Sequence, residues 1–451
     1  MGLSVLRPGR TQQYHDALQH RGQESFGFAL AERGVKKFAS HYSGGHVNSV
    51  FSQPLVSTLT GNLAVGHVRY STSGGATPSG MQPFIVDSKF GPLAVAHNGN
   101  LTNATRYREE LLRAGRTFVS EIDTEIVAHL IAIADEATLV GSVVAAIKKL
   151  RGAFALIIVA EDTLIGIRDA HGIRPLVLGL VDGSYVLASE TCALDIVGAE
   201  FVREISPGEL IVIDKENNIS SVFPFESVKS SFCIFEYIYF ARPDSVIDHR
   251  PVYEARKNIG AELAIESPPP EDVDMVVPVP DSGIPAAMGY ATKAGIPFEF
   301  GIIRNHYVGR TFIQPSSSAR KLGVELKHNA NAALLNGKNI VLVDDSIVRG
   351  TTLREVIALL RRAGTKNIHL RISSPPTVYS CFYGIDTPIR SKLVANKLTI
   401  PQLTEMLNCD SLSFISIDGL YKAIRGEKRN NKAPQYCDAC FTGLYPEGEL
   451  E

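Results

Sequence analysis

The sequence at 339–352 reads Asn339-Ile340-Val341-Leu342-Val343-Asp344-Asp345-Ser346-Ile347-Val348-Arg349-Gly350-Thr351-Thr352. Its four consecutive apolar residues, three of them β-branched, are typical of a buried strand in a parallel sheet. Two acidic residues end the strand, a short loop with Gly350 follows, and residues 353–360 carry apolar side chains at helical spacing. Because ligands of open α/β sheets bind beyond the carboxyl ends of the strands, this stretch predicts a binding site.

The residue types in this stretch indicate the kind of ligand. A helix N-terminus offers unpaired N–H groups to an anion, and the hydroxyls of Ser346, Thr351 and Thr352 add donors. Asp344 and Asp345 would repel a bare phosphate and suit sugar hydroxyls or Mg²⁺ instead. The Walker A Gly-Lys-Ser/Thr and the dinucleotide-binding Gly-x-Gly-x-x-Gly are both absent from the stretch. It therefore predicts a site for a phosphorylated sugar, and the alternative is an ordinary strand-to-helix turn with two solvated acids.

The composition describes an ordinary globular protein with about two or three domains. The chain has 451 residues, of which 45% are hydrophobic and 20% charged, and its formal net charge is −2. This balance gives no electrostatic case for nucleic acid or an anionic membrane as partner. No run approaches about 18 uninterrupted apolar residues and no signal peptide is evident, so we expect no membrane span. Six cysteines in a chain of this length favour a reducing cytoplasm over a disulfide scaffold.

Three polar motifs mark the first half. They are Gln19-His20-Arg21-Gly22-Gln23-Glu24, Gly66-His67-Val68-Arg69-Tyr70-Ser71-Thr72 and His97-Asn98-Gly99-Asn100-Leu101. The last two follow strand-like runs that end in turn residues. An Asn-Gly pair most often forms a tight turn, and the alternative is an oxyanion hole made by the Asn98 side chain and the Gly99 N–H. Asp123 then opens a helical pattern that continues to Ala132.

Two further loops are expected in the second half, after a helix around Val252–Glu266. Met275–Val279 predicts a strand that runs into Pro280-Asp281-Ser282-Gly283-Ile284, where Gly283 lets backbone N–H groups approach an anion closely. The same residue types also favour a plain turn. Residues 304–315 predict a mobile loop whose cations meet a pyrophosphate, with a solvated loop as the alternative.

The cysteines include a Cys-x-x-Cys pair near the C-terminus, Cys437 and Cys440. In a chain of this kind, that spacing indicates metal or redox chemistry. Cys233 and Cys381 would complete a set of four thiolates, which is enough for zinc or for a [4Fe–4S] cluster. Spacing alone neither chooses between these groups nor excludes the other two cysteines from the set.

In their order along the chain, these motifs resemble the glutamine phosphoribosyl pyrophosphate (PRPP) amidotransferases from Gln13 to about Tyr445. The stretch at 339–352 resembles the PRPP motif of type I phosphoribosyltransferases. The resemblance implies an α+β N-terminal-nucleophile, glutaminase-like domain in residues 1–228, with two antiparallel sheets between helical layers in an αββα order. It also implies an α/β phosphoribosyltransferase domain in residues 229–425 and a tail, 426–451, that carries cluster cysteines.

The resemblance also implies roles for residues, beginning with Arg69 and Asp123, which would bind the carboxylate and amino groups of glutamine. Asn98 and Gly99 would stabilise the tetrahedral oxyanion. The residues implied to bind PRPP are Asp281, Ser282, Gly283, Arg310, Lys327, Asp344, Asp345, Ser346, Arg349, Gly350, Thr351 and Thr352. Those implied to hold Mg²⁺ are Ser282, Asp344 and Asp345. The ligands implied for a structural [4Fe–4S] cluster are Cys233, Cys381, Cys437 and Cys440.

Both domains depart from the family pattern. Family members expose a cysteine as the mature first residue, within Cys-Gly-(apolar)-x-Gly-(apolar), and its thiolate attacks the glutamine amide. Here the sequence begins Met1-Gly2-Leu3-Ser4-Val5-Leu6 and has no cysteine before Cys192, so the nucleophile is absent from it. A true loss and a missing or misassigned N-terminal end are the two explanations. His306 and Glu325 stand where arginine is expected, which predicts altered binding of PRPP or of inhibitory nucleotides.

The reaction implied by the resemblance transfers ammonia to PRPP and gives 5-phosphoribosylamine and pyrophosphate, the first committed step of purine synthesis. With a terminal cysteine, the ammonia would come from glutamine and glutamate would be a further product. Without one, the enzyme would use free ammonia or ammonia from a partner. A hypothesis of another class is a non-catalytic homologue that binds PRPP or nucleotides to regulate a partner. A homotetramer and inhibition by purine nucleotides are further expectations of the resemblance.

Overall fold

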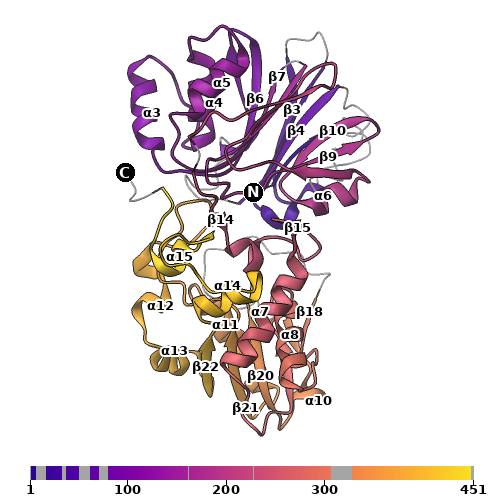
Figure 1. Cartoon of the computed structure of the whole chain (residues 1–451). Helices are drawn as coiled ribbons and strands as arrows, with labels where there is room; N and C mark the ends of the chain where they lie inside the picture. Colours follow the sequence, from indigo (N-terminus) through magenta and orange to yellow (C-terminus); the bar gives the residue numbers. More distant parts are fainter. Residues whose placement is uncertain are drawn as a thin grey trace.

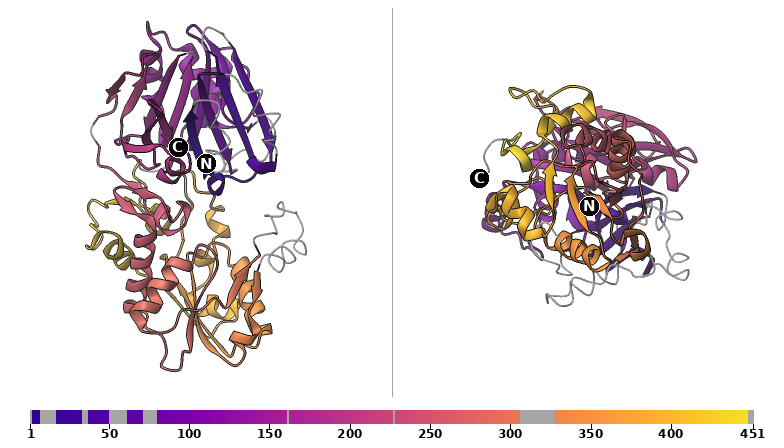
Figure 2. Two further views of the ribbon diagram at one scale, coloured as in Figure 1. Left: turned by 90° about the vertical axis from the view of Figure 1, so that its right-hand side faces the viewer. Right: turned by 90° about the horizontal axis from the view of Figure 1, so that it is seen from below.

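The computed structural model describes residues 2–6, 17–32, 37–49, 61–70, 80–160, 162–226, 228–305 and 328–447. These residues form two domains, drawn one above the other in Figure 1 and seen from two further sides in Figure 2. Four of the residues discussed above lie outside the described ranges: His306, Arg310, Glu325 and Lys327. No helix within the described ranges is long and apolar enough to cross a membrane.

The first domain is built on two antiparallel sheets that face each other (Figure 1). The seven-stranded sheet has the order β11 (Glu200–Glu204), β9 (Val177–Val181), β10 (Ser184–Ala188), β1 (Gly2–Leu6), β4 (Leu63–Arg69), β2 (Ser25–Ala31), β3 (Phe38–Gly44). The six-stranded sheet has the order β13 (Ile219–Val222), β12 (Leu210–Ile213), β8 (Thr163–Arg168), β7 (Gly152–Ala160), β6 (Gly91–Leu101), β5 (Phe84–Ser88). Side chains such as Ala29 and Val65 from one sheet, and Ala94 and Ile157 from the other, fill the space between them.

Helices cover the outer face of each sheet. The six-stranded sheet is covered by α3 (Ala104–Arg113), α4 (Asp123–Ile133) and α5 (Leu139–Ile147), and the seven-stranded sheet by α6 (Thr191–Ile196). Val127 of α4 belongs to the same buried cluster as Val95 of β6, and Leu194 of α6 to the same cluster as Val186 of β10. The expected αββα order of layers is therefore confirmed.

The second domain is an α/β fold around a parallel sheet with the order β17 (Met275–Pro278), β20 (Asn339–Asp344), β21 (Asn367–Ile372), β22 (Ser411–Phe414). One face packs against α7 (Val252–Glu266), α8 (Ile284–Ala294) and α14 (Ile417–Arg425), and the other against α11 (Thr351–Arg362) and α13 (Ile400–Leu407). The strand predicted from 339–352 is confirmed, since residues 340–343 are all buried in β20. Successive side chains point to opposite faces, so Val341 and Val343 pack on one side and Leu342 on the other.

The C-terminal segment returns to the boundary between the domains. There β23 (Tyr436–Cys437) pairs in parallel with β14 (Phe232–Cys233), and Cys233 lies opposite Cys437. A π-helical segment, η5 (Glu236–Phe240), follows β14. From η5 the Glu236 carboxylate accepts a hydrogen bond of 2.8 Å from Arg21 of the first domain. The boundary is thus held by main-chain pairing and by a buried ion pair.

Candidate functional site

The predicted phosphosugar site forms at the carboxyl ends of β17 and β20. Because these strands pair in parallel, with Pro278 opposite Val343, the loops that follow them emerge side by side. The Ser282 hydroxyl of the first loop is close enough to the Asp345 carboxylate of the second loop to lower the pKa of that carboxylate, although burial raises it more strongly. The Ser346 hydroxyl donates to the same carboxylate over 2.5 Å. The structure therefore joins residues that the sequence placed in two separate motifs.

Two glycines shape these loops. A Cβ at Gly283 would lie 2.6 Å from the Val343 carbonyl oxygen, so glycine lets the first loop lie directly against β20. Gly350 has a φ of +72° and precedes α11, whose N-terminus no side chain caps. Thr351 and Thr352 are exposed beside this uncapped turn. Uncapped N–H groups with neighbouring hydroxyls are the arrangement that binds a phosphate.

The acidic pair concentrates negative charge at this point. Asp345 is buried and Asp344 is partly buried. Burial and the neighbouring charge of Asp345 raise the pKa of Asp344 well above its usual value. Burial also raises the pKa of Asp345, against two serine hydroxyls and the charge of Arg256, which lower it. Because a bound cation would relieve this repulsion, the pair is suited to Mg²⁺.

Cationic side chains lie at the edges of this site. Arg304, at the end of β18 (Ile302–Arg304), forms an ion pair with Asp281 of the first loop. Arg349, in the loop before α11, is close enough to Asp386 to lower its pKa, although burial raises that pKa more strongly. Arg304 was predicted only as one of the cations in the loop at 304–315, and its ion pair with Asp281 becomes visible only in the structure.

The predicted oxyanion residues, Asn98 and Gly99, lie inside β6, which pairs with β7 as far as Leu101. The prediction of a tight turn at Asn98-Gly99 is therefore wrong, because backbone pairing with β7 overrides the local preference of this dipeptide. Asn98 is wholly buried, and its Nδ2 has no hydrogen-bond partner among the described residues. Gly99 has a φ of +147°, and a Cβ there would lie 2.0 Å from the Ala153 carbonyl oxygen. A buried donor without a partner next to a position restricted to glycine indicates a site for an acceptor oxygen.

Arg69 and Asp123 supply opposite charges near this strand. Arg69 is the last residue of β4 and Asp123 is the first residue of α4. Burial lowers the pKa of Arg69, and the negative charge of Asp123 acts to raise it. One Asp123 oxygen lies 3.3 Å from His97 Nδ1, and the other accepts the Leu101 N–H over 2.9 Å. Burial acts to raise the pKa of Asp123, but His97 and backbone N–H groups bring it below its usual value. A guanidinium and an ionised carboxylate suit the two charged groups of an α-amino acid.

A loop of the second domain lies directly on the oxyanion segment. The Asn100 Nδ2 donates to the Phe382 carbonyl oxygen over 2.9 Å. A Cβ at Gly384 would lie 2.9 Å from Gly99 Cα, so the two glycines are in close contact. A loop of the second domain therefore covers the oxyanion segment of the first.

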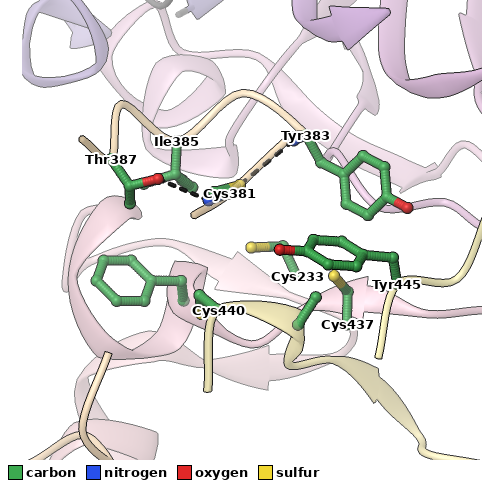
Figure 3. A pocket seen from close by; sticks show the side chains of 10 residues that line it. Cys233, Cys381, Tyr383, Ile385, Thr387, Cys437, Cys440 and Tyr445 are labelled. Atoms are coloured by element: carbon green, nitrogen blue, oxygen red, sulfur yellow. Dashed lines mark hydrogen bonds between the residues drawn. The ribbon is translucent and has the colours of Figure 1, made fainter. Parts of the chain in front are cut away.

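Four of the six cysteines line one cavity at this boundary (Figure 3), namely Cys233, Cys381, Cys437 and Cys440. Aromatic side chains close much of the remaining wall: Phe235, Tyr383 and Tyr445. Burial, and then neighbouring thiols, raise the pKa of Cys440 well above its usual value. Within the described ranges, no three His, Cys, Asp or Glu side chains come close enough to hold a single metal ion. The four thiols instead surround a space between them.

Comparison with known proteins gives the family. A model of the glutamine amidotransferase domain matches residues 67–195, and a model of the phosphoribosyl transferase domain matches residues 255–373. The amidophosphoribosyltransferase of Rhizobium etli is 46% identical over 441 residues, which cover 96% of this chain and 88% of the relative. The chain belongs to the amidophosphoribosyltransferase family. The Bacillus subtilis member is 45% identical over 431 residues, covering 95% of this chain and 89% of that relative.

Two solved structures of the family share the whole fold. One, described as the allosteric regulatory enzyme of purine biosynthesis, has a TM-score of 0.91 and 43% identity over 99% of this chain and 96% of the other. The second, the amidotransferase of B. subtilis with ADP and GMP, has a TM-score of 0.90 and 43% identity over 99% of this chain and 97% of the other. The order of a glutaminase-like domain followed by a phosphoribosyltransferase domain is thereby confirmed.

Sequence reasoning on this amidophosphoribosyltransferase missed a cluster of buried charges at the domain boundary. Its members are Arg21, Arg174, Glu190 and Glu236, all at most 1% exposed. Arg21 pairs with both glutamates, and Arg174 Nη2 lies 3.5 Å from a Glu236 oxygen. Two arginines and two glutamates balance in charge, which makes their burial possible. Arg21 stands in a quoted motif, but nothing in the sequence marks its partners about 170 and 215 residues away.

Proposed function

We propose that this family member makes 5-phosphoribosylamine and pyrophosphate from PRPP and ammonia, the first step of de novo purine synthesis. The observation that carries the proposal is the meeting of Ser282 with the acidic pair, Asp344 and Asp345, beside the uncapped N-terminus of α11. Donors for a phosphate thus stand next to carboxylates for ribose hydroxyls. PRPP is a ribose with a phosphate at one end and a pyrophosphate at the other, so it matches this order of groups.

The site residues divide the substrate among them. Asp344 and Asp345 hold the ribose hydroxyls. The 5′-phosphate lies at the start of α11, held by Ser346, Arg349, Gly350, Thr351 and Thr352. The pyrophosphate lies against the first loop, at Asp281, Ser282 and Gly283. The family resemblance also implies Arg310 and Lys327 as PRPP ligands, and these two lie outside the described residues. Ser282, Asp344 and Asp345 are the residues that would hold Mg²⁺, which when bound would supply positive charge to balance the leaving pyrophosphate.

In the transfer step the protein forms no covalent bond to the substrate. As the bond from C1 to pyrophosphate breaks, the ribose ring develops oxocarbenium character, and the nearby carboxylates stabilise that positive charge. The lone pair of ammonia then forms the new bond to C1, and the resulting ammonium group loses a proton to solvent. Neutral ammonia needs no general base, so none is assigned.

The first domain binds glutamine. Arg69 and Asp123 hold its carboxylate and amino groups, while Asn98 Nδ2 and the Gly99 N–H face its side-chain carbonyl. Release of ammonia needs a nucleophile, and the sequence has no cysteine before Cys192. Loss of the nucleophile makes the enzyme dependent on free ammonia, and a misassigned N-terminal end leaves it dependent on glutamine. Glutamate formation after insertion of a cysteine between Met1 and Gly2 would show that the rest of the glutamine site is intact.

The four-cysteine cavity suits a [4Fe–4S] cluster better than zinc. A zinc ion draws four sulfurs to about 2.3 Å from one point, whereas these thiols surround a space and no described triad is close enough for one ion. When bound, the cluster supplies a structural cross-link between β14, the loop of Cys381 and the C-terminal segment. The segment after Arg425 is held in addition by the pairing of β23 with β14 and by the buried ion pair of Arg429 with Asp438.

The transferase proposal is tested by supplying PRPP, Mg²⁺ and ammonium chloride and detecting 5-phosphoribosylamine by mass spectrometry. Asp344→Asn should abolish the product. Asp274→Asn is the matched control, since Asp274 pairs with Lys338 over 2.9 Å at the opposite ends of β17 and β20. Binding of PRPP without its consumption by the wild type would instead support the non-catalytic regulator.

Further expectations concern regulation and assembly. The B. subtilis relative was solved with ADP and GMP, and we propose purine nucleotides as inhibitors of this chain as well. A homotetramer and a cytoplasmic location are proposed on family grounds. Unchanged phosphoribosylamine formation at saturating ADP and GMP would contradict the first of these.

A further inference from the structure

Arg174 is a buried arginine that the proposed chemistry does not use. It follows β8 in a loop whose main chain is fixed by Asp169, which accepts the Ile173 N–H over 3.1 Å, and by Arg168, which donates to the Arg174 carbonyl oxygen over 2.8 Å. The Arg174 side chain is wholly buried. Its Nε and Nη1 have no hydrogen-bond partner within the described part of the chain. Burying a guanidinium with unpaired donors costs free energy, so its presence at a fixed position indicates a functional role.

The Nη2 of Arg174 reaches the oxyanion residue. It lies 3.4 Å from Asn98 Oδ1 and 3.5 Å from Glu236 Oε1. A guanidinium can only donate hydrogen bonds, so the amide of Asn98 must turn its oxygen towards Arg174. Its Nδ2 then points the other way, where it is buried and without a partner among the described residues.

We propose that Arg174 is a positioning residue that holds the Asn98 amide in the one orientation that offers Nδ2 to the side-chain carbonyl of glutamine. The inference rests on the proposed glutamine site. Without a donor at Arg174, the two orientations of the amide compete, and the flipped one places an oxygen against the carbonyl. The acceptor-to-acceptor contact would then cost the hydrogen bond that distinguishes glutamine from an apolar analogue.

The second domain holds Arg174 in place. Glu236, from η5, pairs with Arg174 and also accepts the 2.8 Å hydrogen bond from Arg21. The Phe240 ring of the same segment lies 4.6 Å from the Arg21 guanidinium and 5.1 Å from that of Arg174, measured to the ring centroid. The orientation of a donor in the glutamine site is therefore set by residues on both sides of the domain boundary.

The test compares two ligands on the full chain by calorimetry. L-Glutamine carries the side-chain amide, and L-norvaline has the same carbon chain without it. The wild type should prefer glutamine, and Arg174→Met should reduce the preference about tenfold, the worth of one hydrogen bond. Asn98→Ala should cause a similar loss, and the double variant should lose no more than either single one. Arg174→Lys keeps a donor and should retain most of the preference.

Controls separate positioning from general damage. Arg203→Met removes another arginine of this domain that is paired with a glutamate, Glu209 at 2.7 Å, and should leave the preference unchanged. Should Arg174→Met not fold, Arg174→Leu replaces it, because leucine likewise removes the donor at this position. An unchanged preference in a folded variant that has no donor at position 174 overturns the inference. Absence of glutamine binding in the wild type overturns the glutamine site itself and the inference with it.

Discussion

Gly99→Ala is the substitution whose effect the structure defines most closely. The new Cβ would lie 2.0 Å from the Ala153 carbonyl oxygen, 2.8 Å from the Ala153 carbonyl carbon and 2.9 Å from His97 Nε2. The first two atoms belong to the main chain of β7, so they cannot turn away as a side chain does. The φ of +147° is also unfavourable for any residue with a Cβ.

These two effects set the expected size of the loss. A residue forced into a sparsely populated φ costs about 1–3 kcal/mol, and overpacking a rigid site costs about 1–3 kcal/mol more. We expect the free energy of unfolding of the first domain to fall by about 4 kcal/mol, the sum of the midpoints. Because His97 holds Asp123, glutamine affinity should fall as well. Each loss of about 1.4 kcal/mol in binding free energy corresponds to a tenfold weaker affinity.

A matched control exists in the same strand. Gly91 begins β6, has a φ of +93°, and a Cβ there would meet nothing within 4 Å. Gly91→Ala should therefore cost only about 1–2 kcal/mol, the price of the backbone conformation. Urea unfolding and calorimetric titration with glutamine compare the two variants. Equal unfolding free energies and equal glutamine affinities for the two would refute the reasoning that β7 restricts Gly99.

Three further predictions concern the other sites. Burial and the charge of Asp345 raise the pKa of Asp344, and Asp345→Asn removes that charge. The pH below which Mg²⁺-dependent PRPP binding weakens should therefore move down, and calorimetry from acidic to neutral pH that finds the same pH in both proteins would contradict this. Cys437→Ser should purify anaerobically without iron and colour, while Cys409→Ser keeps both, and iron retained in the first variant contradicts the cluster. Glu236→Gln leaves buried Arg174 without its ion-pair partner and Arg21 with Glu190 alone, and it should cost about 3–5 kcal/mol of unfolding free energy in urea. A cost below about 1 kcal/mol, the level of an exposed pair, argues against the buried cluster.

The second domain could be predicted closely because its signals are local. The apolar run before Asp344 fixes a strand, and the helical spacing after Gly350 fixes the helix, so both elements appear as β20 and α11. The helix predicted at 252–266 is α7. The tight turn predicted at Asn98 and Gly99 was wrong, because pairing with β7 decides their conformation and strand pairing depends on distant parts of the sequence.

Contacts between segments far apart in the sequence could not be predicted either, because they too depend on how the whole chain folds. Spacing left six cysteines as candidates, and only the fold brings four of them to one cavity. Arg174 and Glu236 were missed because their meeting depends on how the domains pack. Ser282 and Asp345 were both predicted to bind PRPP, but their closeness to each other follows from the parallel pairing of β17 with β20.

The central proposal combines a transferase site in the second domain with a glutamine site in the first, and the sequence has no cysteine before Cys192 to act as the nucleophile. Pyrophosphate release from PRPP, measured with ammonium chloride and with glutamine on one preparation shown by mass to begin at Met1 or Gly2, tests it most directly. The account predicts release with ammonium chloride and none above background with glutamine. No release with either would contradict the transferase site, and equal release with both would contradict the missing nucleophile.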